Sequence, residues 1–279
     1  MKYIFLIRYY IANILYTKLF SFSFAYLVRK QANRWMELYE EYSGPKDWLV
    51  VCNGPSLKKE DLEALSHIPS IASNKISLLF DKTSWRPTLY TICDALLIFK
   101  LKKRHFDDFP IVLSPDYTFS MIRSSNKLPW KTYHKKSIRD ISNSKKNIHD
   151  PVEYGFFRPN TVTASQIQLA MWLGAKNIYV IGCDHSYAEE KHARSAKLNH
   201  GSVSNHFDPS YRTKGEIVNS AAIEKIESDY ELINQIAEKN KVVIKNISRK
   251  TALSIFQRSS VEEAIIDTAR IKIDSEENL

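Results

Sequence analysis

The sequence predicts an α/β fold with a mostly parallel sheet, helices on both faces, and an amphipathic helix at the N-terminus. Short apolar runs rich in Val, Ile and Tyr recur from residue 48 onward, each bounded by turn or charged residues. Helical patterns lie between several of these runs, and this alternation is typical of a parallel, Rossmann-like sheet. The 279 residues, 44% of them hydrophobic and 12% aromatic, suffice for one large buried core.

The individual elements are expected in a regular order. Strands are predicted over the apolar runs 48–52, 70–73, 88–92, 110–113, 178–182 and 242–246. The clearest helical patterns cover 161–175 and 219–240; in the second, apolar residues recur at three- and four-residue steps, with Glu and Lys on the other face. The stretch 123–150 is polar, basic and poor in aliphatic residues, which predicts a surface excursion.

The first thirty residues are rich in Phe, Tyr, Leu and Ile, and they contain basic but no acidic residues. The charges divide this segment into apolar stretches of roughly ten residues, about half the length of a bilayer-spanning helix. No small-residue cleavage site of a secretory signal follows. Two interpretations stay open: a helix lying in an anionic membrane surface, or a helix packed on the domain or on a second copy in a homo-oligomer.

Three parts of the chain follow from this organisation. Residues 1–47 form a basic, aromatic-rich helical segment, residues 48–258 form the α/β domain, and residues 259–279 form a C-terminal helix and polar tail. The three cysteines are far apart, each near the end of an apolar run, as expected for buried thiols in a reducing compartment. We therefore expect a cytoplasmic protein, peripheral on the inner face of the cytoplasmic membrane if residues 1–30 bind lipid.

The net charge of +9 suits a phosphorylated substrate, an anionic membrane or a nucleic acid. No zinc-finger spacing, RNP-type aromatic pattern or regular basic helix indicates nucleic acid. The sequence therefore predicts no nucleic-acid partner.

The turn Asn53-Gly54-Pro55-Ser56 follows the first predicted strand. In an open parallel sheet, ligands bind at the carboxyl ends of the strands, near helix amino termini. Gly54 would let a ligand approach the backbone, Pro55 would fix the turn, and Ser56 would cap a helix starting near Leu57. Exposed backbone amides there suit an anion such as phosphate, although the same residues also form ordinary strand-to-helix turns. The chain has neither a GxGxxG fingerprint nor a GxxxxGK[ST] loop.

Polar residues also follow other predicted strands. One cluster begins where the strand 178–182 ends, and a second lies within 199–211. Single polar residues, Asn74 and Asp94, follow the strands 70–73 and 88–92. The two clusters contribute Gly182, Asp184, His185, Ser186, Tyr187, His200, Asn205, His206, Asp208 and Tyr211.

Two histidine-bearing clusters suit either a metal site or an acid/base pair. His185 and His206 lack the close helical spacing of an HExxH motif, and no carboxylate pair is shared between the clusters. We therefore predict no metal site. The remaining histidines, among them His67 and His105, are interpreted as solvated residues.

Six motifs occur in an order that resembles one known family. They are "VCNGPSL", "SNKI", "YTICD", "TVTASQIQLAMWLGAKNIYVIGCDHSY", "NHFDPSY" and "KNISRKTALSIFQR". Their order is similar to that of the 6-hydroxymethylpterin diphosphokinase MptE-like domain, which also occurs in motility accessory factors that glycosylate flagellin and in proteins of surface-polysaccharide loci. The layout also resembles that of bacterial sialyltransferases of the Campylobacter type. The resemblance covers about residues 48–258.

The sialyltransferase likeness implies roles for individual residues. The Asn53–Ser56 turn would contact the nucleotide phosphate and ribose, the helix start at 161–163 would approach the phosphate or a sugar carboxylate, and His206 would be the general base, an imidazole that titrates near neutrality. This chain has Thr-Val-Thr where the sialyltransferases show Thr-Ser-Gly, and Cys-Asp-His where they show Ile-Asp-Phe; both departures follow the MptE-like pattern. The candidate catalytic residues are His206 and His185; the candidate nucleotide or donor contacts are Asn53, Gly54, Pro55, Ser56, Asn74, Asp94, Thr161, Thr163, Gly182, Asp184 and Ser186; and Asn205 and Tyr211 are candidate acceptor or donor contacts.

The favoured function is that of a glycosyltransferase without metal or cofactor. It would transfer a sugar from a nucleotide-sugar donor, such as a CMP-nonulosonate, to a glycan or lipid-linked acceptor in surface glycan biosynthesis. One alternative is diphosphate transfer from ATP to 6-hydroxymethyl-dihydropterin, which would require Mg²⁺ and for which Asp94, Asp184 and Asp208 are the candidate ligands. A further alternative is a non-catalytic nucleotide-binding module that recruits partners through its basic surface.

Overall fold

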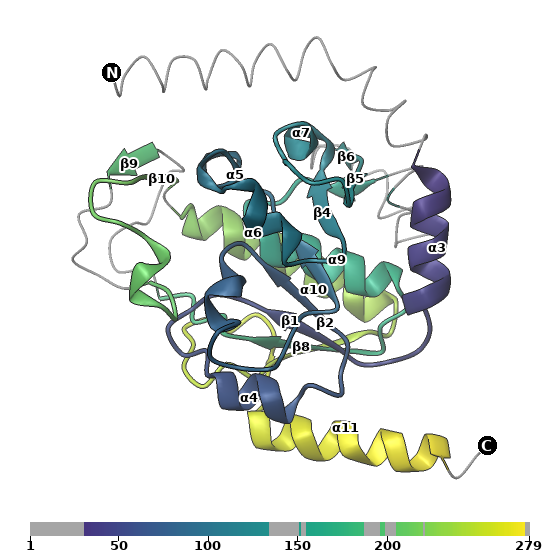
Figure 1. The fold of residues 1–279 in the computed structure, drawn as a ribbon. Coiled ribbons are helices and arrows are strands. Elements are labelled where there is room, and N and C mark those ends of the chain that lie inside the picture. The colour runs from purple at the N-terminus through teal and green to yellow at the C-terminus, as the bar shows by residue number, and fades with distance from the viewer. Residues whose placement is uncertain are drawn as a thin grey trace.

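The computed structural model describes residues 31–133, 151, 155–186, 196–198, 205–219 and 221–276. These residues form a Rossmann-like α/β fold in which helices flank a central sheet (Figure 1). In the described part of the chain the sheet has eight strands, and each neighbouring pair is parallel. The predicted fold class is confirmed.

The strand order places the chain's first strand in the middle of the sheet. The order in space is β12 (Gln257–Arg258), β11 (Val243–Asn246), β8 (Asn177–Ile181), β1 (Trp48–Val51), β2 (Ser70–Ser73), β3 (Leu89–Thr91), β4 (Val112–Pro115) and β5 (Lys127–Trp130). From β1 the chain first builds outward to β5, and then returns to add β8, β11 and β12 on the other side of β1. The order therefore reverses between β1 and β8, where ligands bind in sheets of this kind.

All six predicted strands are present, within two residues of their expected bounds. The prediction of a surface excursion over 123–150 is wrong for β5, which forms the edge strand next to β4. Its sequence, Lys-Leu-Pro-Trp, contains a proline, which is tolerated at a sheet edge but not at its centre. Two small separate sheets pair β6 (Thr132–Tyr133) with β7 (Phe156–Phe157), and β9 (Ala196–Leu198) with β10 (Ile217–Asn219).

The sheet is buried on both faces, as strand β1 shows. Trp48 and Val50 belong to the apolar cluster on one face, and Leu49 and Val51 belong to the cluster on the other. Alternate side chains of a strand point to opposite faces, so each face needs its own cover. The first cluster includes residues of α3 (Ala32–Tyr42), α9 (Val162–Trp172) and α10 (Ile223–Lys239); the second includes residues of α4 (Lys59–Ala64), η1 (Ile76–Leu79), α5 (Ala95–Lys100), α6 (Lys103–Asp107) and α11 (Val261–Glu276).

Both appended segments share the core of the α/β domain where they are described. Trp35 of α3 is buried, and its indole Nε1 donates to the carbonyl oxygen of Pro129 at 2.8 Å. Val261 and Ala264 of α11 are buried in the second cluster. Residues 1–30, for which we predict a membrane or packing helix, lie outside the described residues. Within the described part, no helix is both long and apolar enough to cross a bilayer.

Two predicted helix starts are corrected by the structure. The helix after the Asn53–Ser56 turn begins at Lys59, so Ser56 does not cap it. The helix predicted over 219–240 begins at Ile223, because residues 217–219 pair as β10 with β9. A short α7 (Asp116–Phe119) and a single-turn η3 (Pro209–Tyr211) complete the described elements.

The interpretation of His105 as a solvated residue is also wrong. His105 lies on α6, and its Nε2 is 3.0 Å from the hydroxyl of Tyr90 and 3.1 Å from the carbonyl oxygen of Asn74. Burial lowers the pKa of His105 to about 4. This histidine is therefore a neutral, hydrogen-bonded part of the fold near neutral pH.

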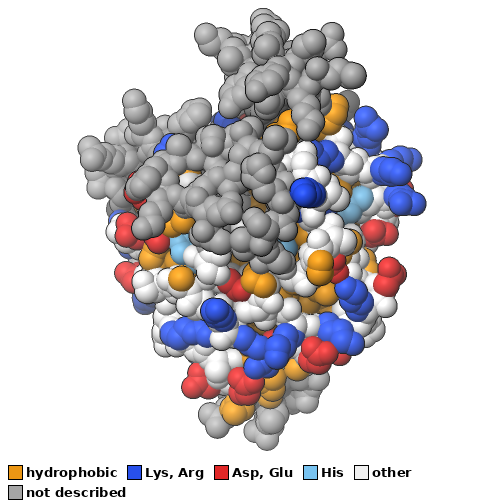
Figure 2. Space-filling view, turned by 90° about the vertical axis from the view of Figure 1, so that its left-hand side faces the viewer, with side chains coloured by type: hydrophobic (Ala, Val, Ile, Leu, Met, Phe, Trp, Pro, Cys, Tyr) orange, Lys and Arg blue, Asp and Glu red, His pale blue; other side chains and the backbone are white. Residues whose placement is uncertain are grey.

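The basic residues are dispersed over the face in Figure 2. Lys and Arg side chains form separate groups there, with Asp and Glu side chains among them.

Candidate active site

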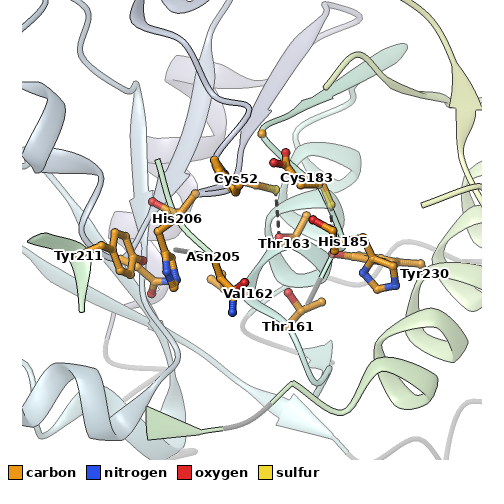
Figure 3. Close-up of a pocket in the computed structure, with 17 residues that line it drawn as sticks. Cys52, Thr161, Val162, Thr163, Cys183, His185, Asn205, His206, Tyr211 and Tyr230 are labelled. Carbon is orange, nitrogen blue, oxygen red and sulfur yellow. Dashed lines mark hydrogen bonds between the residues drawn. The ribbon is translucent and has the colours of Figure 1, made fainter. Parts of the chain in front are cut away.

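A pocket opens at the carboxyl ends of β1 and β8, where the strand order reverses. Its volume is about 140 Å³, below the roughly 300–1,000 Å³ of a typical small-molecule site. The cavity that the described residues enclose is therefore smaller than a typical small-molecule site. The lining residues, shown in Figure 3, are Cys52, Asn53, Gly54, Pro55, Asn74, Thr161, Val162, Thr163, Gly182, Cys183, Asp184, His185, Ser186, Asn205, His206, Tyr211 and Tyr230.

The pocket lining includes all the candidate site residues predicted from the sequence except Ser56 and Asp94. Tyr187 and His200, named with the same clusters, lie outside the described residues. The segment that carries Asn205 and His206 reaches the pocket because the Phe207 amide donates to the carbonyl oxygen of Asn53 at 3.1 Å. Four lining residues were not predicted: Cys52, Val162, Cys183 and Tyr230.

Hydrogen bonds between Ser56 and Asp184 hold the turn that follows β1. The Ser56 amide donates to the Asp184 carboxylate at 2.8 Å, and the Ser56 hydroxyl donates to the same carboxylate. Asp184 is 5% exposed. A buried carboxylate that accepts from a backbone amide and a hydroxyl fixes both groups, so Asp184 ties the end of β8 to the turn after β1.

The end of β8 leaves no room for a side chain at Gly54. A Cβ atom there would lie 2.5 Å from the carbonyl oxygen of Gly182 and 2.8 Å from the Asp184 carboxylate. The Gly54 amide donates to the same Gly182 oxygen at 2.8 Å. Close approach of the ends of β1 and β8 is therefore sufficient to require glycine here.

Asp94 has a structural role outside the pocket. Its carboxylate caps α5 by accepting from the backbone amides of Leu96 at 3.0 Å and Leu97 at 3.4 Å. The same carboxylate accepts from the side-chain Nδ2 of Asn219 at 2.9 Å. An N-cap aspartate stabilises a helix start without any ligand. The structure therefore does not place Asp94 among the contacts of a bound nucleotide.

Two asparagines that line the pocket each have a buried amide oxygen without a hydrogen-bond partner among the described residues. Within the described part of the chain, Oδ1 of Asn53 and Oδ1 of Asn74 have no hydrogen-bond partner. Asn53 donates through Nδ2 to the Ser73 hydroxyl at 3.3 Å, and Asn74 adopts a left-handed φ of 61°. A buried amide oxygen without a donor costs free energy, so each of these asparagines has an acceptor that the described residues leave unsatisfied.

The amino end of α9 points at the centre of the pocket (Figure 3). Thr161 is its N-cap, and no side chain among the described residues caps its backbone amides. Thr163 is 5% exposed, and its hydroxyl lies 3.2 Å from Cys52 Sγ. An uncapped helix start combines free amides with the positive end of the helix dipole, so this part of the pocket favours an anion.

His206 and Tyr211 form one wall, to the left of α9 in Figure 3. Their rings stack with centroids 3.8 Å apart and planes 12° apart. Desolvation, and then the cations Arg212 and Lys75, lower the pKa of His206 to about 3. The prediction that this imidazole titrates near neutrality is therefore wrong for the ligand-free protein.

This shift predicts acid sensitivity of the fold. A histidine whose pKa falls from 6.5 to about 3 on folding binds more protons when unfolded, so stability decreases as the pH falls below 6.5. His206→Phe keeps a stacking ring but does not titrate. Urea unfolding between pH 6 and pH 4 measures the free energy of unfolding of both proteins. For each pH unit of acidification, we expect the wild type to lose about 1.4 kcal/mol more of this free energy than His206→Phe loses. Parallel curves for the two proteins would contradict this assignment.

His185, Cys183 and Tyr230 form the opposite wall, to the right of α9 in Figure 3. His185 Nε2 lies 3.1 Å from the Glu227 carboxylate of α10, and the ring meets Tyr230 edge-on with centroids 6.2 Å apart. The Tyr230 hydroxyl lies 3.8 Å from Cys183 Sγ. The pocket thus has an imidazole on each side of a helix start, one near cations and one bound to a carboxylate.

The candidate magnesium ligands do not converge. Asp94 caps α5, Asp184 binds Ser56, and Asp208 accepts from Lys82 at 2.6 Å. Of the three, only Asp184 lines the pocket. Among the described residues, no group of three or more His, Cys, Asp or Glu side chains is arranged to hold a metal ion. The described residues therefore do not fit a site in which these three carboxylates share Mg²⁺.

Comparison of the chain with protein-family models, with curated proteins and with solved structures finds no match.

Proposed function

We propose that this chain is a transferase that binds a nucleotide-activated sugar, such as a CMP-nonulosonate, and transfers the sugar to a hydroxyl of a glycan or lipid-linked acceptor. One observation carries the proposal. An uncapped helix start and two buried, unpaired amide oxygens meet in one pocket at the reversal of the strand order. This combination suits a ligand with an anionic group and adjacent hydrogen-bond donors, as in a nucleotide.

In this proposal the donor's phosphate lies at the amino end of α9. The dipole and amides of α9 stabilise the negative charge that grows on the phosphate as the sugar leaves. Asn53 and Asn74 accept from ribose hydroxyls or from the base. The nearby cations Lys75 and Arg212 lie behind the His206 wall, where they add to the favourable potential for an anion.

The resemblance of six ordered motifs to the MptE-like domain and to Campylobacter-type sialyltransferases supports the same proposal. In the diphosphokinase alternative, positioning and Mg²⁺ would carry most of the catalysis. The separate engagement of Asp94, Asp184 and Asp208 favours glycosyl transfer over that alternative. The predicted membrane contact of residues 1–30 would bring a lipid-linked acceptor to the enzyme.

The test is a binding screen with CMP, UDP, GDP and ATP, each with and without Mg²⁺. A ligand present at about one hundred times its Kd stabilises the native state by about 2.7 kcal/mol, which raises the melting temperature by several degrees. We expect CMP to give the largest shift, independent of Mg²⁺. A shift with ATP alone that requires Mg²⁺ would favour the diphosphokinase, and no shift with any nucleotide would refute a nucleotide site.

Variants of Asn53 and Asn74 test whether these residues contact the nucleotide. Asn53→Ala and Asn74→Ala each remove one acceptor from the pocket, and we expect each to weaken CMP binding about tenfold, the effect of roughly 1.4 kcal/mol. Asn126, which is exposed and lies outside the pocket, serves as the control, and Asn126→Ala should bind CMP like the wild type. Calorimetric titration measures all three. Unchanged affinity in both pocket variants would remove these amides from the proposed nucleotide site.

A further inference from the structure

His185 combines an unusual backbone conformation with a side-chain contact to a carboxylate. It adopts a left-handed φ of 52°, which non-glycine residues seldom adopt, four residues after the end of β8. Its side chain is 3% exposed, and its Nε2 lies 3.1 Å from Glu227, whose side chain is 44% exposed. Backbone strain of this kind costs free energy and concentrates at functional sites.

The contact with Glu227 fixes the tautomer of the ring. A carboxylate can only accept, so Nε2 of His185 carries the proton in this hydrogen bond. In the neutral ring the lone pair is then on Nδ1. A carboxylate that accepts from one ring nitrogen also fixes the orientation of the imidazole, as in catalytic triads.

The other imidazole in the pocket has the opposite environment. His206 is near Arg212 and Lys75, and its lowered pKa makes it a weak base. A general base works best when its pKa lies near the operating pH. The cationic surroundings of His206 suit the departing phosphate, whereas the carboxylate beside His185 holds that ring in one orientation.

We propose that His185, oriented by Glu227, is the general base of the transfer reaction, and that Glu227 is its positioning residue. This inference rests on the proposed function. Nδ1 of His185 takes the proton of the acceptor hydroxyl while the acceptor oxygen bonds to the anomeric carbon of the sugar. The bond between that carbon and the phosphate oxygen breaks, and the phosphate leaves with the electron pair. The His185 imidazolium, paired with Glu227, then returns its proton to water.

This division places the two reacting partners on opposite sides of α9. The acceptor approaches from the side of α10, which supplies Glu227 and Tyr230, and the nucleotide occupies the side of His206 and Tyr211. The edge-on contact with Tyr230 restrains the His185 ring on its second side. Both contacts come from α10, so this helix serves as the support of the base.

The test uses the full chain with CMP–N-acetylneuraminate as probe and measures release of CMP, because a base that activates a hydroxyl also activates water. We expect His185→Asn to lower kcat by about 10²–10⁴-fold and Glu227→Gln by about tenfold or more, with the Kd for CMP within about threefold of the wild type. Glu231 is an exposed carboxylate on the same helix, and Glu231→Gln should match the wild type in both measurements.

A second measurement does not depend on turnover. ¹⁵N chemical shifts of the imidazole should show a proton on Nε2 of His185 in the wild type, and loss of this preference in Glu227→Ala. If both His185→Asn and Glu227→Gln bind CMP and keep the wild-type kcat, His185 is not the general base. That outcome would leave the proposed function standing. A wild-type protein that neither binds CMP nor cleaves the probe would overturn the proposed function, and with it this assignment.

Discussion

Gly54→Val is expected to unfold the protein, or to destabilise it by more than about 3 kcal/mol, and not merely to block a ligand. A Cβ atom at Gly54 would lie 2.5 Å from the Gly182 carbonyl oxygen, which is backbone and cannot turn aside. The same atom would press on the Asp184 carboxylate that holds Ser56. Either strand end must move, and both belong to the centre of the sheet.

Urea unfolding followed by circular dichroism measures this effect. Gly54→Ala carries the same Cβ atom and should show most of the loss. Pro55→Ala changes the same turn at an exposed residue, and we expect it to cost less than about 1 kcal/mol. A Gly54→Val protein that is as stable as the wild type but does not bind CMP would restore the interpretation that a ligand, and not the Gly182 backbone, requires the glycine.

The sequence could predict the site because parallel strands deliver their carboxyl ends to one edge. Polar residues after the runs 48–52, 70–73 and 178–182 were therefore expected near one another, and Asn53, Asn74 and Asp184 line the same pocket. What the sequence did not contain was the neighbour relation of β1 and β8, which are far apart along the chain. That relation depends on the order in which the strands pack, and it explains why the local motif at Ser56 was interpreted as a helix cap rather than as a partner of Asp184.

The α10 contacts show a second limit of sequence reasoning. The helical pattern over 219–240 placed apolar residues on one face and Glu and Lys on the other. The folded protein agrees with this pattern, since Tyr230 is 2% exposed and the Glu227 side chain 44%. Only the packing of α10 against the end of β8 brings these residues to Cys183 and His185. A helix pattern predicts which residues share a face, but not which partner that face meets.

The pKa of His206 is also a property of the tertiary structure. Its loop position in the sequence gave no sign of the stacking with Tyr211 or of the nearby Arg212 and Lys75. Burial and neighbouring charge together decide whether an imidazole is protonated near neutrality. Composition and spacing can therefore nominate a histidine as catalytic, but they cannot rank two histidines as bases.

Asp229 on α10 supports the helix start at which we place the phosphate. It is 0% exposed, and its Oδ2 accepts from the backbone amide of Asn160 at 2.6 Å and from the Asn160 side chain at 2.9 Å. Asn160 directly precedes Thr161, the N-cap of α9. The carboxylate thus fixes the backbone that orients the first amides of α9 toward the pocket.

Asp229→Ala is therefore expected to lower both stability and nucleotide affinity. Removing the carboxylate leaves the Asn160 amide and side chain without their acceptor, at about 1.5–3 kcal/mol for each hydrogen bond to a charged group, so we expect a loss of roughly 3 kcal/mol or more. CMP affinity of the folded fraction should fall about tenfold, because the amides of α9 lose their fixed direction.

Two variants serve as controls for this prediction. Asn160→Ala keeps the hydrogen bond from the backbone amide and should show a smaller loss in both urea unfolding and calorimetric titration. Glu238→Ala, at an exposed position near the other end of α10, is the control for changes to the helix itself. Full CMP affinity in a destabilised Asp229→Ala protein would show that this carboxylate serves the core alone and that the start of α9 needs no support to bind an anion.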